Sequence, residues 1–193
     1  MHPLQAVKDK NIILGSTSPR RKELLAQLGL PFIVQSIDCQ EDYPINTPVH
    51  EITAYLAEKK AKAFGAISNN QLLMTADTLV VLGNEVLGKP KSTAEAKAML
   101  QKLSGKTHEV FTSICVCSED KHIIHTEKTK LWVQHLTQTE IDYYVENYKP
   151  LDKAGAYGIQ EWFGQVAIHK IEGCYYNVMG LPLAALYQVL KNF

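Results

Sequence analysis

Several features that mark large classes of proteins are missing from this sequence of 193 residues. It contains no run of about 18 apolar residues, the length that a membrane-spanning helix needs. Its first ten residues, MHPLQAVKDK, are too polar for a signal peptide. A net charge is also missing, because 20 basic side chains balance 20 acidic ones, and this disfavours general binding to DNA or RNA. We therefore expect a cytoplasmic protein that binds neither a membrane nor nucleic acid.

Common cofactor and metal motifs are missing as well. There is no GxxxxGK[ST] and no GxGxxG sequence, so neither a P-loop ATPase nor a nicotinamide enzyme is indicated. The four cysteines form no CxxC pair, and the seven histidines form no HExxH or HxH pattern. We expect buried free thiols in a reducing compartment, with Cys115 and Cys117 on one face of a strand.

What the sequence does contain is enough apolar residues, 46% of the chain, for one substantial domain. Helical and strand patterns alternate, but several strands form hairpins, which predicts an α/β fold with a mixed sheet. The expected strands cover 11–15, 32–37, 72–76, 79–87 (a hairpin), 107–117, 123–134, 165–171 and 174–178. The expected helices cover 19–28, 49–66, 92–103, 137–148 and 182–191.

The most informative segment is NIILGSTSPRRKELLAQL, residues 11–28. An apolar strand ends at a glycine, a hydroxyl-rich loop follows, and a proline stands in the first turn of the next helix. Free amides at a helix N-terminus attract anions, and paired arginines bind phosphate oxygens well. One interpretation is a phosphate cradle formed by Ser16, Ser18, Arg20 and Arg21. An ordinary capped helix with its arginines in solvent explains the local pattern equally well.

Three further segments carry residues suited to chemistry. Asp77, at the end of an apolar run, could bind a divalent metal or accept a proton from water, although a turn-forming aspartate has the same pattern. Lys89, held between a glycine and a proline, could point at a phosphate, whereas a lone lysine before proline is normally solvated. In LDKAGAYGIQ, residues 151–160, the small residues permit close approach by a ligand, and Gln160 offers a donor and an acceptor to a nucleobase. A tight strand bend explains these glycines equally well.

Together these residue types suit phosphoryl chemistry, which depends on positioning and charge stabilisation. The blocks GSTSPRRKELLAQLGLPF, TADTLVVLGNEVLGKP, LSGKTHEVFTSICV, LDKAGAYGIQEW and NVMGLPLAALYQVL occur in an order that resembles the Maf family of nucleoside triphosphate pyrophosphatases, over residues 11–192. The resemblance implies a single domain, 1–193, with an elongated mixed sheet flanked by helices and two lobes around a cleft, related to inosine triphosphate pyrophosphatases. It implies hydrolysis of a nucleoside triphosphate to the monophosphate and pyrophosphate with a divalent cation, Mg or Mn. A homodimer is compatible with it.

The resemblance also implies roles for individual residues. It makes Asp77 the proton acceptor and a metal ligand. It places the phosphate contacts at Ser16, Arg20, Arg21, Lys60 (in AEKKA) and Lys89.

Base preference is linked, by the same resemblance, to Arg20, Thr78 and Gln160. Their combination resembles the subgroup that hydrolyses dTTP and UTP. A related subgroup that prefers 7-methyl-GTP is the main alternative for the substrate. A non-enzymatic nucleotide-binding regulator of cell division is the alternative from another class of protein.

The sequence departs from the family pattern in one place. The family carries an acidic residue after the second strand, where this chain reads IDCQED, residues 37–42. An ungapped register places Cys39 at that position, and a short insertion returns it to Glu41. We favour Glu41 as the second metal ligand, because a thiol is a poor ligand for a hard cation.

Overall fold

The strands form one mixed sheet in the computed structural model, which describes residues 3–193. The strand order is β2-β1-β3-β5-β6-β7, and β4 pairs with β3. The strands are β1 (Asn11–Leu14), β2 (Phe32–Val34), β3 (Gln71–Leu82), β4 (Glu85–Leu87), β5 (Thr107–Cys117), β6 (His122–Val133) and β7 (Ile168–Glu172). β1 is parallel to β2 and β3, whereas β4 is antiparallel to β3 and β7 is antiparallel to β6. The predicted α/β fold with a mixed sheet is thus confirmed.

Several of the helices begin at side-chain capping residues. They are α1 (Pro19–Ala26), α2 (Val49–Phe64), α3 (Thr93–Leu103), α4 (Gln138–Tyr148), α5 (Trp162–Val166), α6 (Tyr175–Met179) and α7 (Leu183–Lys191), with 3-10 turns η1 (Pro150–Asp152) and η2 (Ala154–Ala156). Ser92 accepts a hydrogen bond from the Glu95 amide at the start of α3. At the start of α4, Thr137 and Glu140 bond each other's backbone amides in a capping box. None of the helices in the described residues is both long and apolar enough to cross a membrane.

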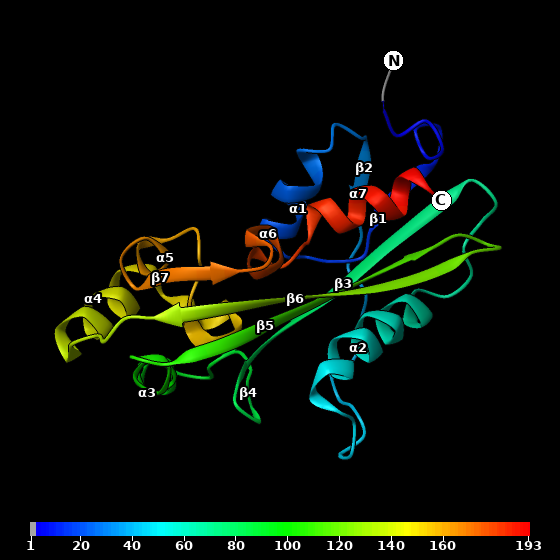
Figure 1. Ribbon diagram of the computed structural model, residues 1–193. Helices are drawn as coiled ribbons and strands as arrows, with labels where there is room; N and C mark the ends of the chain where they lie inside the picture. The colour runs from blue at the N-terminus through cyan, green and yellow to red at the C-terminus, as the bar shows by residue number, and fades with distance from the viewer. Residues whose placement is uncertain (1–2) are drawn as a thin grey trace. The chain divides into compact units, whose positions relative to one another are not determined.

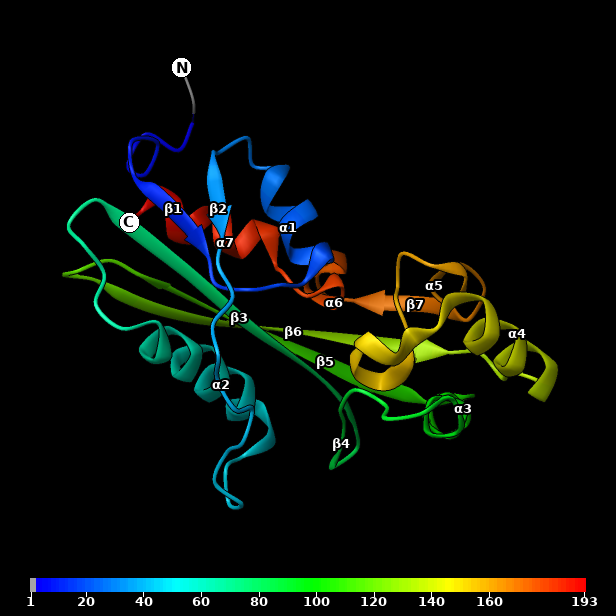
Figure 2. The same ribbon diagram turned by 180° about the vertical axis from the view of Figure 1, so that it is seen from behind.

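The chain divides into two compact units, each assembled from separate stretches of sequence. Unit 1 contains the residues up to Asp77 together with Thr112–Glu127 and Gly180–Phe193, and unit 2 contains Thr78–Phe111 and Lys128–Met179. In unit 1, α2 lies on one face of the sheet, and α1 and α7 lie on the other (Figures 1 and 2). One hydrophobic cluster of unit 1 joins strand residues to α2 and consists of Ile13, Ala57, Ala61, Leu73, Cys115 and Cys117.

Unit 2 has its own hydrophobic core. Residues from α3, α4 and the segment after η2 pack together with β4 and the unit 2 parts of β3, β5 and β6. Tyr144 of α4 is fully buried, stacks on Tyr148 and packs against Phe163. These aromatic contacts fix the segment 154–163 against α4.

One predicted strand is wrong, because residues 174–178 lie in and next to helix α6. Gly173 adopts a φ of 125°, which turns the chain out of the sheet after β7. The hydroxyl of Thr129 then bonds the backbone of Cys174, and it also accepts a hydrogen bond from the buried amide of Asn177. β7 therefore pairs with β6 and not with the following segment. The predicted strands at 72–76 and 79–82 are parts of one continuous strand, β3.

Candidate functional site

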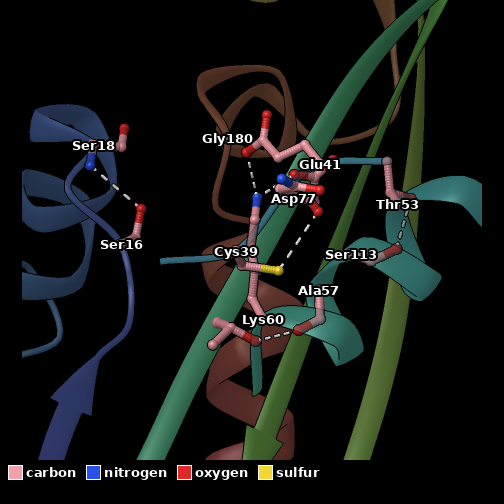
Figure 3. Close-up of polar contacts among 12 residues, drawn as sticks. Ser16, Ser18, Cys39, Glu41, Thr53, Ala57, Lys60, Asp77, Ser113 and Gly180 are labelled. Atoms are coloured by element: carbon pink, nitrogen blue, oxygen red, sulfur yellow. Dashed lines mark hydrogen bonds and ion pairs between the residues drawn. The ribbon is translucent and has the colours of Figure 1, made fainter. Parts of the chain in front are cut away.

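The loop between β1 and α1 is held in shape by hydrogen bonds from its own residues. Ser18 caps α1 by accepting from the Arg21 amide at 3.4 Å, and Pro19 is the first helical residue. The hydroxyl of Ser16 accepts from the Ser18 amide at 3.3 Å (Figure 3). It also accepts from Nη1 of Arg21 at 3.3 Å. A Cβ on Gly15 would lie 2.5 Å from Cδ1 of Ile37 and 2.9 Å from Cγ2 of Thr75, so any larger residue would require these side chains to move. The sequence correctly predicted both the cap and the clustering of these hydroxyls with an arginine.

The side chain of Arg21 is held within unit 1 by a hydrogen bond to the backbone. Its Nε donates to the carbonyl of Gly180 at 2.9 Å, which ties the N-terminal loop to the start of the C-terminal segment. The pKa of Arg21 is lowered because burial outweighs the favourable charges of Asp77 and Glu41. The neighbouring Arg20 is partly buried and also lowers it. A helix with both arginines fully in solvent, the alternative left open by the pattern, does not describe Arg21.

A lysine between two carboxylates forms the charged centre of unit 1. Nζ of Lys60 lies 2.5 Å from Oδ1 of Asp77 and 2.7 Å from Oε1 of Glu41 (Figure 3). The Asp77 and Lys60 side chains are only 8% and 12% exposed, whereas that of Glu41 is 48% exposed. Three residues that the sequence analysis singled out separately thus come together at one point.

The electrostatics of Asp77 follow from its burial. Its pKa is raised because the cost of burying the carboxylate exceeds the stabilisation by the charges of Lys60 and Arg21. Glu41, a like charge, raises it further. A carboxylate with a raised pKa is a stronger proton acceptor than an ordinary aspartate.

The position of Lys60 depends on contacts that the sequence analysis did not identify. The hydroxyl of Thr75 on β3 donates to the carbonyl of Ala57 at 2.6 Å. This hydrogen bond fixes α2 against the part of β3 that belongs to unit 1, which ends at Asp77. One turn earlier, the buried hydroxyl of Thr53 bonds that of Ser113 on β5 at 2.7 Å (Figure 3). The only sequence signal for these contacts is a polar threonine within otherwise apolar stretches.

The contacts of Cys39 and Glu41 differ, and this difference bears on which of them is the second metal ligand. Glu41 contacts Lys60, whereas the thiol of Cys39 lies 3.7 Å from the carbonyl of its own neighbour, Gln40. Oδ1 of Asp77 and Oε1 of Glu41 both contact the Lys60 ammonium, so these two oxygens lie close to each other. Carboxylate oxygens are the hard donors that Mg and Mn prefer, so this pair fits a divalent cation in its chemistry.

The other predicted site residues belong to unit 2. Thr78 follows Asp77 directly in β3 and is partly exposed, and Lys89 is exposed just after β4. The loop that carries Lys89 is joined to the glycine-rich segment, because the Gly155 amide donates to the Gly88 carbonyl at 3.1 Å. This hydrogen bond brings together two blocks that lie far apart in the sequence.

Gln160 ends the glycine-rich segment and is half-buried. Its Oε1 is buried and has no hydrogen-bond partner within the part of the chain that the structure describes. A buried acceptor without a partner is costly, and such atoms are often completed by a ligand. Gln160 therefore has an open position for a hydrogen-bond donor.

Ion pairs of the buried Lys153 shape the segment before Gln160. Lys153, only 9% exposed in its side chain, lies 2.8 Å from Asp152 and 3.1 Å from Glu161. The hydroxyl of Tyr144 donates to Glu161 and accepts from the Gly158 amide at 2.9 Å. Gly155, at a φ of 68°, lets the chain turn next to β3. The tight bend that the sequence left open is present, and the bend and the ion pairs of Lys153 lie directly before Gln160.

Comparisons with known proteins identify the family and the fold of this chain. A family model described as Maf-like protein matches residues 11–193. A protein of Porphyromonas gingivalis named dTTP/UTP pyrophosphatase is 45% identical over 194 residues, covering 98% of each chain. Another of the same name, from Flavobacterium psychrophilum, is 49% identical over 186 residues, covering 96% of this chain and 95% of the relative. A HAM1 protein from Coxiella burnetii shares the fold, with a TM-score of 0.51 at 18% identity over 95% of this chain and 100% of that chain. The family match over nearly the whole length shows that this chain belongs to the Maf family.

Proposed function

We propose that this protein hydrolyses dTTP and UTP to the nucleoside monophosphate and pyrophosphate. Two of its full-length relatives carry the name of that activity. The observation on this chain that carries the proposal is the buried Asp77 carboxylate, which shares the Lys60 ammonium with Glu41. Such a group of charges has little structural value by itself, because a buried ion pair seldom stabilises a fold more than apolar packing does.

In the proposed reaction, Asp77 accepts a proton from the water that attacks phosphorus. The oxygen of that water forms a bond to the attacked phosphorus. The bond between the α- and β-phosphates breaks, and pyrophosphate is the leaving group. Its raised pKa suits Asp77 to this step, since a general base works best when its pKa is close to the working pH. The proton then passes to solvent.

The phosphates of the substrate need positive charge and hydrogen-bond donors. We assign these to Ser16, Arg20, Arg21, Lys60 and Lys89. A Mg or Mn ion held by Asp77 and Glu41 would neutralise charge on the phosphate oxygens. Arg21 is preorganised for such a role, since the Gly180 carbonyl and the Ser16 hydroxyl hold its guanidinium.

The base is assigned to Gln160, Thr78 and Arg20. The ring N3–H of uracil or thymine is a donor flanked by two carbonyl oxygens. It matches an amide side chain, which has an NH₂ donor beside its oxygen, and in Gln160 that oxygen has an open acceptor position. The same features suit pyrimidines modified at carbon 5, because that position lies away from the paired edge. The 7-methyl-GTP preference of the related subgroup is the alternative.

The experiment that tests the proposal identifies products from a panel of nucleotides. The full chain is incubated with Mg or Mn and with dTTP, UTP, 5-methyl-UTP, CTP, GTP and 7-methyl-GTP, and the products are separated by chromatography. We expect pyrophosphate with TMP or UMP. Release of orthophosphate would indicate a phosphatase, and binding without turnover would favour the regulator of cell division. Light scattering on the same sample measures whether the chain forms the expected homodimer.

The role of Asp77 is tested by Asp77→Asn with Asp42→Asn as the matched control. Loss of a general base lowers turnover by about 10²–10⁴-fold, so we expect a fall of that size in kcat for Asp77→Asn. Asp42 instead forms an ion pair at the surface with Lys59, the residue before Lys60 in the sequence. The Asp42→Asn variant should therefore keep wild-type turnover. Asp77→Asn turnover within a few-fold of the wild type would contradict the assignment.

A further inference from the structure

Two thiols and an imidazole, none of them assigned to the reaction, come together in unit 1. Sγ of Cys115 lies 3.3 Å from Sγ of Cys117 and 3.0 Å from Nε2 of His122. All three atoms lie within 4.8 Å of one another. β5 carries the cysteines, and β6, which follows it in the chain, begins with the histidine.

The spacing of these residues did not indicate a metal site. Cys115 and Cys117 were expected on one face of a strand, which the structure confirms. His122 reaches them because the short connection after Cys117 folds back, with the Ser118 amide donating to the Lys121 carbonyl at 2.8 Å. The turn, and not a recognised motif, supplies the third ligand.

The surroundings of the cluster are apolar on one side and open on the other. Both thiols are buried in the cluster formed with Ala57 and Ala61 of α2, the helix that covers this face of the sheet (Figure 1). His122 is exposed. A metal ion could therefore enter from the side of the imidazole, and solvent could provide a further ligand there.

A disulfide does not explain the proximity of the two thiols. Residues two apart in a strand are about 6.8 Å apart at Cα, with their Cβ atoms pointing the same way. A disulfide requires Cβ atoms about 3.5–4.5 Å apart, so the bond would break the regular geometry of β5. A metal ion requires a smaller change in the strand, because ligand atoms of tetrahedral zinc lie about 3.5–3.8 Å apart when the bonds measure about 2.0–2.3 Å. The spacing from Cys115 to Cys117 and that from Cys115 to His122 are each within about half an ångström of that.

We propose that Cys115, Cys117 and His122 form a zinc site, with one solvent ligand completing a tetrahedron. Thiolate and imidazole are the ligands that zinc favours, and this set differs in kind from the carboxylates of Asp77 and Glu41. Charge selects a divalent ion over Cu⁺. Two thiolates with Zn²⁺ are neutral, whereas with Cu⁺ they would leave a buried negative charge next to the Glu58 carboxylate, which already acts on both sulfurs.

The test is a titration of the full chain, reduced and freed of metal, with Co²⁺ as a spectroscopic substitute for zinc. Excess Mg²⁺ is present throughout, so that sites made of oxygen ligands are filled. We expect one Co²⁺ per chain with a sulfur-to-cobalt charge-transfer band in the near ultraviolet and intense visible bands typical of a tetrahedral site. Zinc should displace the cobalt and raise the temperature of unfolding.

Matched variants separate this site from adventitious binding. His122→Gln removes an exposed ligand, so it is expected to fold, and it should weaken Co²⁺ binding by at least about tenfold. Cys117→Ala should abolish the charge-transfer band. His125→Gln, on the same strand, and Cys174→Ser should bind as the wild type does. The absence of a charge-transfer band in the wild type, or equal affinity in His122→Gln, would overturn the proposal.

Discussion

Replacing Lys60 with methionine should destabilise unit 1 because it leaves Asp77 as an unpaired buried charge. Lys60 and Asp77 are 12% and 8% exposed, and their charged atoms are 2.5 Å apart. Methionine keeps most of the apolar stem of lysine, so the change isolates the loss of the ammonium. Removing one partner of a buried ion pair costs about 3–5 kcal/mol. The positive charge of Arg21 still acts on Asp77, and we therefore expect the lower end of that range.

The loss of about 3 kcal/mol corresponds to a fall of about 6–12 °C in the temperature of unfolding, at about 2–4 °C per kcal/mol for a chain of this size. It should depend on pH. Without Lys60 the pKa of Asp77 rises further above its value of 3.8 in the unfolded chain. The deficit is therefore smallest below about pH 4 and grows as the pH rises through the pKa of Asp77 in the folded state. The acidic limb of the pH–rate profile should shift to higher pH for the same reason.

Thermal unfolding of three further proteins completes the experiment. Lys59→Met is the matched control, because Lys59 makes an equally short ion pair with Asp42, which is 73% exposed, and this variant should unfold near the wild type. Asp77→Asn should lose less stability than Lys60→Met, since Lys60 keeps Glu41 as a partner and the variant removes a carboxylate whose burial is unfavourable. The double variant Lys60→Met with Asp77→Asn should recover much of the loss. If Lys60→Met unfolds like Lys59→Met, or if the double variant recovers nothing, the reasoning is refuted.

Two further predictions concern unit 2. Burial lowers the pKa of His108 from 6.5 to about 4, so the unfolded chain binds a proton between these pH values that the folded chain does not. The free energy of unfolding should therefore fall by about 3 kcal/mol as the pH drops from 6.5 to 4, and chemical denaturation of His108→Gln should lack this part of the pH dependence. Gln160→Leu replaces the amide with an apolar side chain that has neither donor nor acceptor, so the KM for dTTP should rise about tenfold with little change in kcat. An unchanged ratio of kcat/KM between dTTP and GTP in Gln160→Leu would remove Gln160 from base recognition.

The local elements could be predicted because the interactions that define them are local. The caps at Ser18, Ser92 and Thr137 each bond an amide three residues away, and the sequence shows both partners together. The failure at residues 174–178 has the opposite cause. There the hydroxyl of Thr129, 45 residues earlier, bonds Cys174, and this contact overrides the local strand pattern.

By itself, the sequence determined the mixed α/β fold, the family, and the residue types available to bind phosphate and to accept a proton. Only the tertiary structure decided how they are combined. Lys60 lies among several lysines of one helix, and nothing in their order shows which of them reaches Asp77 and Glu41. Arg21 is held by a carbonyl 159 residues away. The thiols of Cys115 and Cys117 gain a histidine from the next strand. These contacts depend on the packing of α2 and on the path of the chain between strands. Burial then raises the pKa of Asp77 and lowers that of Arg21, and neighbours that are distant in the sequence modify both shifts.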